Sequence, residues 1–312
     1  MPEGAEVVMP WRKIERTNPS DPGTPAYGFA TDGAELYVNF YEVVVKMPLA
    51  GGNVTEVFRS PNELTLGIKS FQDGNGMVLL DLGKWTRIPF GGGAPQALSL
   101  TLPVGSKVFD FDPATSSVWA ELNDFDAKTV TVIKGNVDSG AVETILGPQP
   151  RSKGYRWYRF GDRFFSEGES NGVKRPMFVA QQGGNLEPFP TNPASRRLMG
   201  ATKNFLYYLS DAFNGEDFGA FRISLAGGAS ERVYSKTFIP DVTESWRDDS
   251  TLYTNDANSI ERFSEAGEAR QITSLPADGN CTSHGVLAHD GYVYVATYQS
   301  SSGENQIWRI KE

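Results

Sequence analysis

Hydrophobic and polar positions alternate in short runs along the chain, and residues 27–60 give the clearest example. In that segment the extended runs are AYGFATD, ELYVNFY, VVVKMPLA and NVTEVFRS, and the turn dipeptides DG and GG lie between them. Short alternating runs that are separated by turn residues are typical of β-strands joined by hairpins. The segment therefore predicts a unit of four short antiparallel strands.

The same unit recurs along the chain. In four units a base lies six residues before a turn glycine, as Lys46 does before Gly52. The full series, with a phenylalanine in its fourth place, is Lys46, Arg87, Lys134, Phe178, Arg222, Arg262 and Arg309. The spacings are 41, 47, 44, 44, 40 and 47 residues, which gives seven units. Four-stranded repeats of this length are typical of β-propeller blades.

The seventh unit ends after three strands, while EVVMPWRKI at 6–14 is an extended run that belongs to no unit. An open sheet edge invites aggregation, so we expect this N-terminal strand to complete the last blade. The sequence thus predicts an all-β, seven-bladed propeller in a single domain, 1–312. Its expected blades span about 27–60, 61–104, 105–149, 150–194, 195–238, 239–276, and 277–312 together with 5–15.

The repeated residues have a structural interpretation. Adjacent glycines supply positive φ at a tight hairpin, and Leu49, Phe90 and Leu225, which precede them, are expected to pack between blades. The repeated base could form a functional ring, or it could be a solvated or salt-bridged outer position. We interpret the repeated base as a solvated or salt-bridged outer position.

Composition narrows the class of partner. The 312 residues carry a formal net charge of −9, and the 29 Lys and Arg residues are scattered, which argues against a nucleic acid partner. No apolar run approaches the roughly 20 residues that a membrane span needs, and the N-terminal segment lacks the apolar core of a signal peptide. Cys281 is the only cysteine, so no intrachain disulfide forms. We expect a monomer.

The motif DG-x-x-LYV at 32–38, followed by a base and PLAGG, resembles the repeats of bacterial propellers in the broad TolB-like and YWTD-like group. The resemblance covers residues 27–312 and implies a scaffold that binds proteins or ligands, although some members are enzymes. It also favours an extracytoplasmic location, although the sequence itself does not distinguish this location from the cytoplasm. The YWTD tetrapeptide, the WD dipeptide at blade ends and the sialidase S-x-D-x-G-x-T-W box are missing, so no catalytic residue carries over.

Searches by residue type yield few catalytic candidates. His284 and His289 are the only histidines, which excludes a three-histidine metal centre. Cys281 and His284 lie close together in GNCTSHGV and could act as nucleophile and base, but a lone cysteine is also a common buried residue. The catalytic residues therefore stay unknown, and no metal ligand is assigned.

Acidic residues are more numerous in the expected turns. None of their clusters follows the spacing of an EF-hand, so we expect no cofactor, with calcium as an alternative. The same residues could cap their own turns or supply a pair of glycosidase carboxylates. They are Asp110, Asp112, Asp124, Asp126, Asp211, Glu216, Asp217, Asp248, Asp249 and Asp256.

Two kinds of loop emerge at one mouth of the expected channel: those between the second and third strands, and those from one blade to the next. Aromatic and arginine side chains concentrate at binding hot spots, and these loops are rich in them. The candidate ligand-binding residues are Tyr41, Asp126, Arg151, Tyr155, Trp157, Arg197, Phe213, Glu244, Trp246 and Tyr298, with Phe125 and Arg196 beside them. Alternatively, Trp157 and Trp246 wedge between blades.

Two functions from different classes follow. The first is a noncatalytic propeller that binds a protein, peptide or glycan at this mouth. It predicts that replacing Trp157, Arg197 and Trp246 abolishes capture of a partner with the melting temperature nearly unchanged. The alternative is a hydrolase or lyase with an acidic site in the channel, with or without calcium, which requires turnover to be lost on Asp126→Asn or Asp211→Asn.

Overall fold

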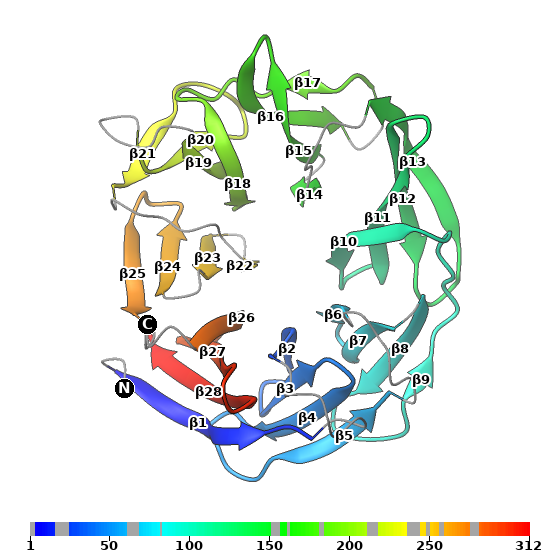
Figure 1. Ribbon diagram of the computed structural model, residues 1–312, viewed down its shortest axis with the longest axis vertical. Coiled ribbons are helices and arrows are strands. Elements are labelled where there is room, and N and C mark those ends of the chain that lie inside the picture. The colour runs from blue at the N-terminus through cyan, green and yellow to red at the C-terminus, as the bar shows by residue number, and fades with distance from the viewer. Residues whose placement is uncertain are drawn as a thin grey trace.

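The described residues of the computed structural model form a ring of seven sheets (Figure 1). Each sheet has four antiparallel strands, and no helix occurs among these residues. Accordingly, none of the described residues belongs to a helix that is long and apolar enough to cross a membrane. The described residues are 4–15, 25–60, 69–81, 83–150, 157–160, 163–180, 184–210, 218–235, 244–247, 250–255, 259–274 and 281–312.

The first four blades follow one another along the chain, and each runs from an inner strand to an outer one. Blade 1 contains β2 (Gly28–Thr31), β3 (Glu35–Phe40), β4 (Val43–Pro48) and β5 (Thr55–Arg59). Blade 2 contains β6 (Lys69–Gln72), β7 (Gly76–Asp81), β8 (Lys84–Pro89) and β9 (Gln96–Ala97). Blade 3 contains β10 (Ser106–Asp112), β11 (Ser117–Asp124), β12 (Thr129–Asn136) and β13 (Val142–Pro150). Blade 4 contains β14 (Trp157–Phe160), β15 (Arg163–Ser170), β16 (Val173–Ala180) and β17 (Glu187–Pro188).

The other three blades close the ring. Blade 5 contains β18 (Ser195–Ala201), β19 (Phe205–Ser210), β20 (Ala220–Ser224) and β21 (Glu231–Tyr234). Blade 6 contains β22 (Glu244–Arg247), β23 (Thr251–Asn255), β24 (Ser259–Ser264) and β25 (Ala269–Ser274). Blade 7 contains β26 (Cys281–His289), β27 (Tyr292–Gln299), β28 (Glu304–Lys311) and the N-terminal strand β1 (Ala5–Lys13).

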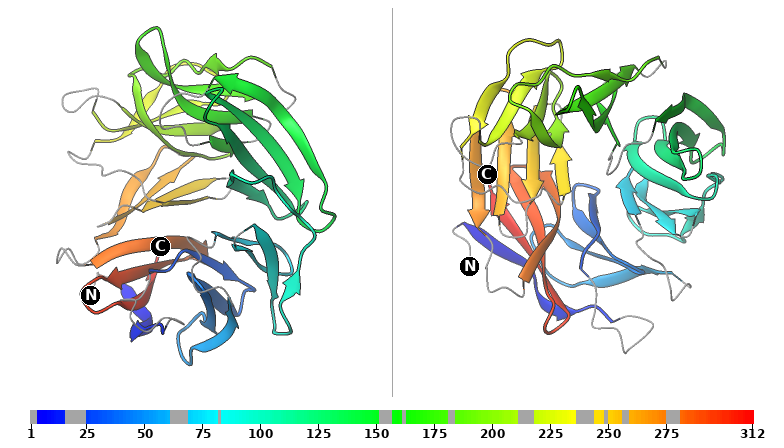
Figure 2. Two further views of the ribbon diagram at one scale, coloured as in Figure 1. Left: turned by 45° about the vertical axis from the view of Figure 1, so that its right-hand side comes forward. Right: turned by 45° about the horizontal axis from the view of Figure 1, so that its top comes forward.

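The N-terminal strand completes the last blade, as the sequence predicts. Strand β1 pairs antiparallel with β28, from Ala5 opposite Ile310 to Lys13 opposite Glu304. Both views of Figure 2 show the dark blue strand beside the red one. The carboxylate of Glu6 accepts a hydrogen bond of 2.8 Å from Nε of Arg309, which fixes the two ends of the chain together. The ring is therefore closed by pairing between its two terminal strands.

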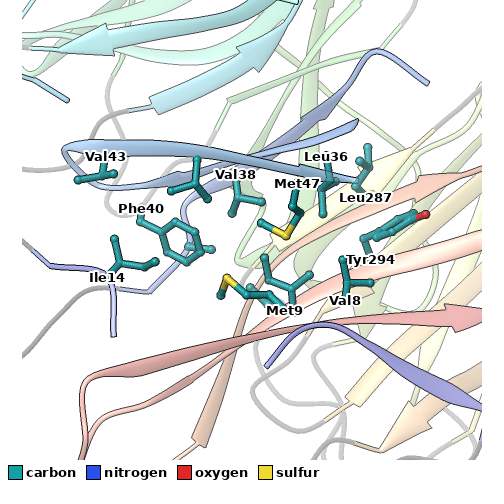
Figure 3. Packing of buried hydrophobic residues seen from close by; sticks show 14 residues of the cluster. Val8, Met9, Ile14, Leu36, Val38, Phe40, Val43, Met47, Leu287 and Tyr294 are labelled. Atoms are coloured by element: carbon teal, nitrogen blue, oxygen red, sulfur yellow. The ribbon is translucent and has the colours of Figure 1, made fainter. Parts of the chain in front are cut away.

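The hydrophobic core is divided among the seams between blades. Each of the seven buried clusters that the described residues form combines side chains of two neighbouring blades. Figure 3 shows the cluster at the seam of blades 7 and 1, where Met9 and Tyr294 meet Phe40 and Met47. Leu49, Phe90 and Leu225 pack against three of these clusters, which confirms their predicted place between blades.

One glycine of the repeated turn is also required by the closure. Gly51 has a φ of 90°, a conformation that side chains disfavour, and a Cβ at this position would lie 2.9 Å from the carbonyl oxygen of Val8 in β1. The turn of blade 1 can therefore approach the closing strand only because residue 51 has no side chain.

The repeated bases take part in ion pairs within their own sheets. Nζ of Lys46 lies 2.6 Å from a carboxylate oxygen of Glu35 on the adjacent strand, and Lys134 lies 3.3 Å from Glu143. Arg87, Arg222, Arg262 and Arg309 form ion pairs as well. The interpretation of the base as a salt-bridged position is confirmed.

Candidate functional site

The strand order gives the ring two faces of different character. In an antiparallel blade, the turn between the second and third strands and the connection to the next blade leave from the same end. We call this end the loop face; it includes residues 41–42, 98–105 and 125–128. The opposite end, the turn face, carries the hairpin turns between the first and second strands and between the third and fourth strands.

Acidic residues of the turn face hold the backbone of their own turns. Oδ1 of Asp32 accepts hydrogen bonds from the backbone N–H groups of Ala34 and Glu35, at 2.9 and 2.8 Å. Burial acts to raise the pKa of Asp32, but these bonds and one from Tyr37 outweigh it and lower the pKa overall. The interpretation of acidic residues as turn caps is also confirmed for Asp112.

A tyrosine and an arginine clamp the seam between blades 5 and 6 from the turn face. The Tyr207 hydroxyl donates to the carbonyl oxygen of Ser264 at 3.0 Å, and Nη1 of Arg222 donates to that of Glu265 at 2.7 Å. Burial raises the pKa of Tyr207, so its hydroxyl remains protonated and can donate. Both side chains come from adjacent positions of β19 and β20 and bind the next blade's turn.

The clamp recurs at other seams. Tyr294 and Arg309 donate to the carbonyl oxygen of Leu49, at 3.5 and 3.4 Å. Arg87 reaches Asp138 of the next blade at 3.0 Å. The sequence analysis identified the bases but missed the tyrosines. Their signal is the repeated strand pattern LYV, LYY and VYV around Tyr37, Tyr207 and Tyr294.

Tyr41 lies on the loop face of blade 1, in the turn between β3 and β4. Its φ of 63° is unusual for a residue with a side chain, and its ring lies 5.7 Å from that of Tyr27. The backbone N–H of Tyr27 is bonded to the Asn39 carbonyl oxygen at 2.7 Å, which places the two aromatic rings at the end of the same strand pair. Strained residues gather at functional sites, so Tyr41 stays a candidate.

Among the residues that the structure describes, the most exposed large apolar side chains lie on the loop face of blade 3. Val104 is fully exposed and Phe125 is 69% exposed. Since Ser106 at the start of β10 pairs with Leu122 near the end of β11, both side chains lie beyond the same end of this strand pair. Val104, in the segment LPVG, was not among the predicted site residues.

The turn that carries Phe125 is held by its own acidic residue. Oδ1 of Asp124 accepts hydrogen bonds from the backbone N–H groups of Asp126 and Ala127, at 3.0 and 2.8 Å. Lys128 has a φ of 55° and ends the turn. Asp126 itself is exposed. Phe125 is therefore presented by a fixed turn.

Trp157 lies in the core, which corrects one expectation. It is 3% exposed and packs with Trp119, Val130 and Phe164 in the cluster between blades 3 and 4. It begins the inner strand β14 and does not lie in a connecting loop, so the alternative prediction that Trp157 wedges between blades is confirmed. A side chain buried in this way cannot be replaced with the melting temperature unchanged.

The other predicted residues are spread around the ring. Arg197 lies on β18 and Tyr298 on β27, and both are half-buried. Glu244 and Trp246 belong to the inner strand β22, where the sequence analysis expected a loop. Several predicted positions lie outside the described residues: Arg151, Tyr155 and Phe213 of the candidate binding set, and Asp211, Glu216, Asp217, Asp248, Asp249 and Asp256 of the acidic set.

Among the described residues, no three side chains of His, Cys, Asp or Glu gather as a metal site requires. Calcium stays a prediction, because several acidic candidates lie outside that part of the chain. Asp110 is paired instead: its Oδ2 lies 2.6 Å from Nε of Arg159 in the next blade. The guanidinium of Arg159 also stacks 4.0 Å from the ring centre of Trp119.

Solved structures with a similar fold include proteins of different kinds. The structure of YCF48 bound to D1 peptide has a TM-score of 0.59 and 10% identity, over 97% of this chain and 95% of that one. The Pan2 WD40 domain of Neurospora crassa has a TM-score of 0.55 and 9% identity, over 98% and 97%. A puromycin-hydrolyzing peptidase of Mycobacterium tuberculosis has a TM-score of 0.54 and 11% identity, over 97% of this chain and 56% of that one.

At these identities the similarity shows the fold alone. The seven-bladed propeller predicted from the repeats is confirmed, while the resemblance to the TolB-like and YWTD-like group stays a prediction. No protein-family model and no curated protein matches the sequence.

Proposed function

We propose that this protein is a noncatalytic propeller scaffold that binds a peptide, or an extended segment of a partner protein, on its loop face. The observation that carries the proposal is the exposure of Phe125 and Val104 at one end of blade 3. Large apolar side chains that are exposed to water at one end of a blade are candidates for an interaction site.

The local structure favours binding at this position. The Asp124 carboxylate fixes the turn, so Phe125 loses little conformational freedom when a partner covers it. An aromatic side chain buries a large area on contact and is a common hot spot of interfaces. The tip of blade 3 is thus a preorganised apolar anchor point.

The similar structures support this class of function. YCF48, with the same fold, has been solved with a peptide bound. The low identity carries no contact residue to this chain, so the binding residues are inferred from this structure only. A glycan partner, the monomeric state, the extracytoplasmic location and the TolB-like grouping remain predictions, and so does the acidic catalytic alternative.

Selection of a random peptide display library against the protein tests the proposal. Peptides that are enriched should bind the double variant Phe125→Ser, Val104→Ser at least about tenfold more weakly than the wild type. Val142→Ser is the matched control, because Val142 is a 42% exposed valine of the same blade at its turn face. All three proteins should have the same melting temperature.

Two results would overturn the proposal. In the first, the selection enriches no peptide. In the second, the enriched peptides bind the double variant as tightly as the wild type, or Val142→Ser weakens them as much.

A further inference from the structure

A groove opens between the outer strands of blades 7 and 1, away from the tip of blade 3. Its volume is about 360 Å³, near the lower end of the range for ligand pockets. One wall is the end of β1 with the two residues after it, and the other is formed by β4 and β5. The lining residues are Arg12, Lys13, Ile14, Glu15, Val43, Val45, Val54, Glu56 and Arg59.

The charge of Arg59, one of the three bases that line the groove, is already neutralised. The guanidinium of Arg59 forms two hydrogen bonds with the carboxylate of Glu56, at 3.0 and 2.6 Å, and lies 3.5 Å from the buried carboxylate of Glu42. It also donates to the backbone carbonyl oxygen of Glu15 at 3.1 Å. Arg59 therefore holds the two walls together and has little capacity left for a ligand.

The other two bases have no such partner. Arg12 and Lys13 are exposed, and neither forms an ion pair with any residue that the structure describes. Glu15 is the nearby countercharge, so the lining holds three bases against two acids. The chain as a whole has a net charge of −9 and repels acidic groups, whereas the local excess of bases in the groove attracts them.

The floor of the groove is apolar. Ile14, Val43 and Val45 are buried and belong to the core cluster between blades 7 and 1, and Val54 packs against it. Figure 3 shows Ile14 and Val43 at the end of this cluster, beside Phe40. A ligand seated here would meet aliphatic carbon below and the two bases at the rim.

We propose that this groove is a second binding site, which takes a short acidic peptide segment with an aliphatic residue next to its carboxylates. The bases Arg12 and Lys13 bind the carboxylates, and the valine floor receives the aliphatic side chain. The site is separate from the apolar tip that carries the proposed function, so either can be wrong without the other.

Fluorescence anisotropy with three labelled peptides tests the proposal. The probes are Leu-Glu-Leu-Glu, its glutamine counterpart Leu-Gln-Leu-Gln, and Ser-Glu-Ser-Glu, each capped at both ends. The wild type should bind the first about tenfold more tightly than either of the others, and added salt should weaken it. The double variant Arg12→Gln, Lys13→Gln should lose this preference.

The matched control is Lys84→Gln, Lys311→Gln, which changes the net charge equally at exposed bases outside the groove. It should bind like the wild type, as should the Phe125→Ser, Val104→Ser variant. The proposal is overturned if Leu-Glu-Leu-Glu does not bind at about 1 mM, if either other peptide binds as well, or if the two charge variants behave alike.

Discussion

The two faces of this propeller differ in which side chains they leave exposed. On the turn face, the Tyr207 hydroxyl and the Arg222 guanidinium bind backbone carbonyl oxygens of the next blade, and Asp32 caps its own turn. On the loop face, Phe125 projects into water and Lys13 has no ion-pair partner among the described residues. Asp124 and Arg59 hold the backbone on the loop face too, but there Phe125, Val104 and Lys13 are left exposed.

The difference indicates which residues stabilise the fold and which are candidates for binding a partner. The repeated bases occupy equivalent positions in six of the seven blades, and Tyr37, Tyr207 and Tyr294 each lie opposite such a base, where they serve the fold. Phe125, Val104 and the pair Arg12 and Lys13 do not belong to these repeated series. In a protein built from repeats, a departure from the repeat is therefore the better guide to a binding site.

The largest effect is expected from an aromatic side chain that lies near the loop face but belongs to the core. Trp157→Ala should lower the free energy of unfolding by about 3–5 kcal/mol, because it leaves a cavity between blades 3 and 4. Urea denaturation measures it. Phe125→Ala is the control and should stay within about 0.5 kcal/mol of the wild type. Equal losses would contradict the assignment of these two aromatic residues to different roles.

Most of the fold could be predicted from the sequence, because every blade solves the same packing problem with the same residue types. The turn glycines, the bases and the alternating strands set the period, and the unpaired segment around Val8 predicts the closure. The inner strands were harder to predict. Strands β14 and β22 have four residues each, too few for an alternating pattern, so Trp157 and Trp246 were assigned to loops.

The second-largest effect is expected from a variant that removes one side chain of the clamp on the turn face. Arg222→Met should lower the free energy of unfolding by about 2–3 kcal/mol, since the substitution removes charged hydrogen bonds to one buried and one partly buried carbonyl oxygen of the next blade. Lys134→Met changes the equivalent position of blade 3, where the base pairs with the exposed Glu143, and should cost below about 1 kcal/mol. Chemical denaturation of both variants is the measurement, and similar losses would reject the clamp.

The candidate sites could be predicted only in part, because they depend on how unequal loops meet. Phe125 was predicted as an aromatic residue in a turn, but nothing in the segment LPVG predicts that Val104 is exposed at the same end of blade 3. Arg12 and Lys13 were read as the end of a closing strand. Their role in a groove depends on Arg59 being occupied by Glu56 and Glu42, which requires three-dimensional contacts.

The smallest expected effect is a pH dependence of the free energy of unfolding, and it arises at the seam that the same clamp holds. Burial acts to raise the pKa of Glu265, but hydrogen bonds from the backbone and side chain of Asn204, at 2.7 and 2.9 Å, contribute to a net lowering. A carboxylate with a lowered pKa stabilises the fold above its unfolded pKa, here near 4.5, and this contribution is lost as the pH falls through the folded value.

Glu265→Gln should therefore be less stable than the wild type by about 1 kcal/mol or less at neutral pH, and the gap should close as the pH falls below about 4. Glu268→Gln, at a more exposed carboxylate of the same turn, should show a smaller gap. Denaturation curves over this pH range measure both. A gap for Glu265→Gln that is the same at neutral and acid pH would mean that its charge does not hold the seam, and that the clamp rests on Tyr207 and Arg222 alone.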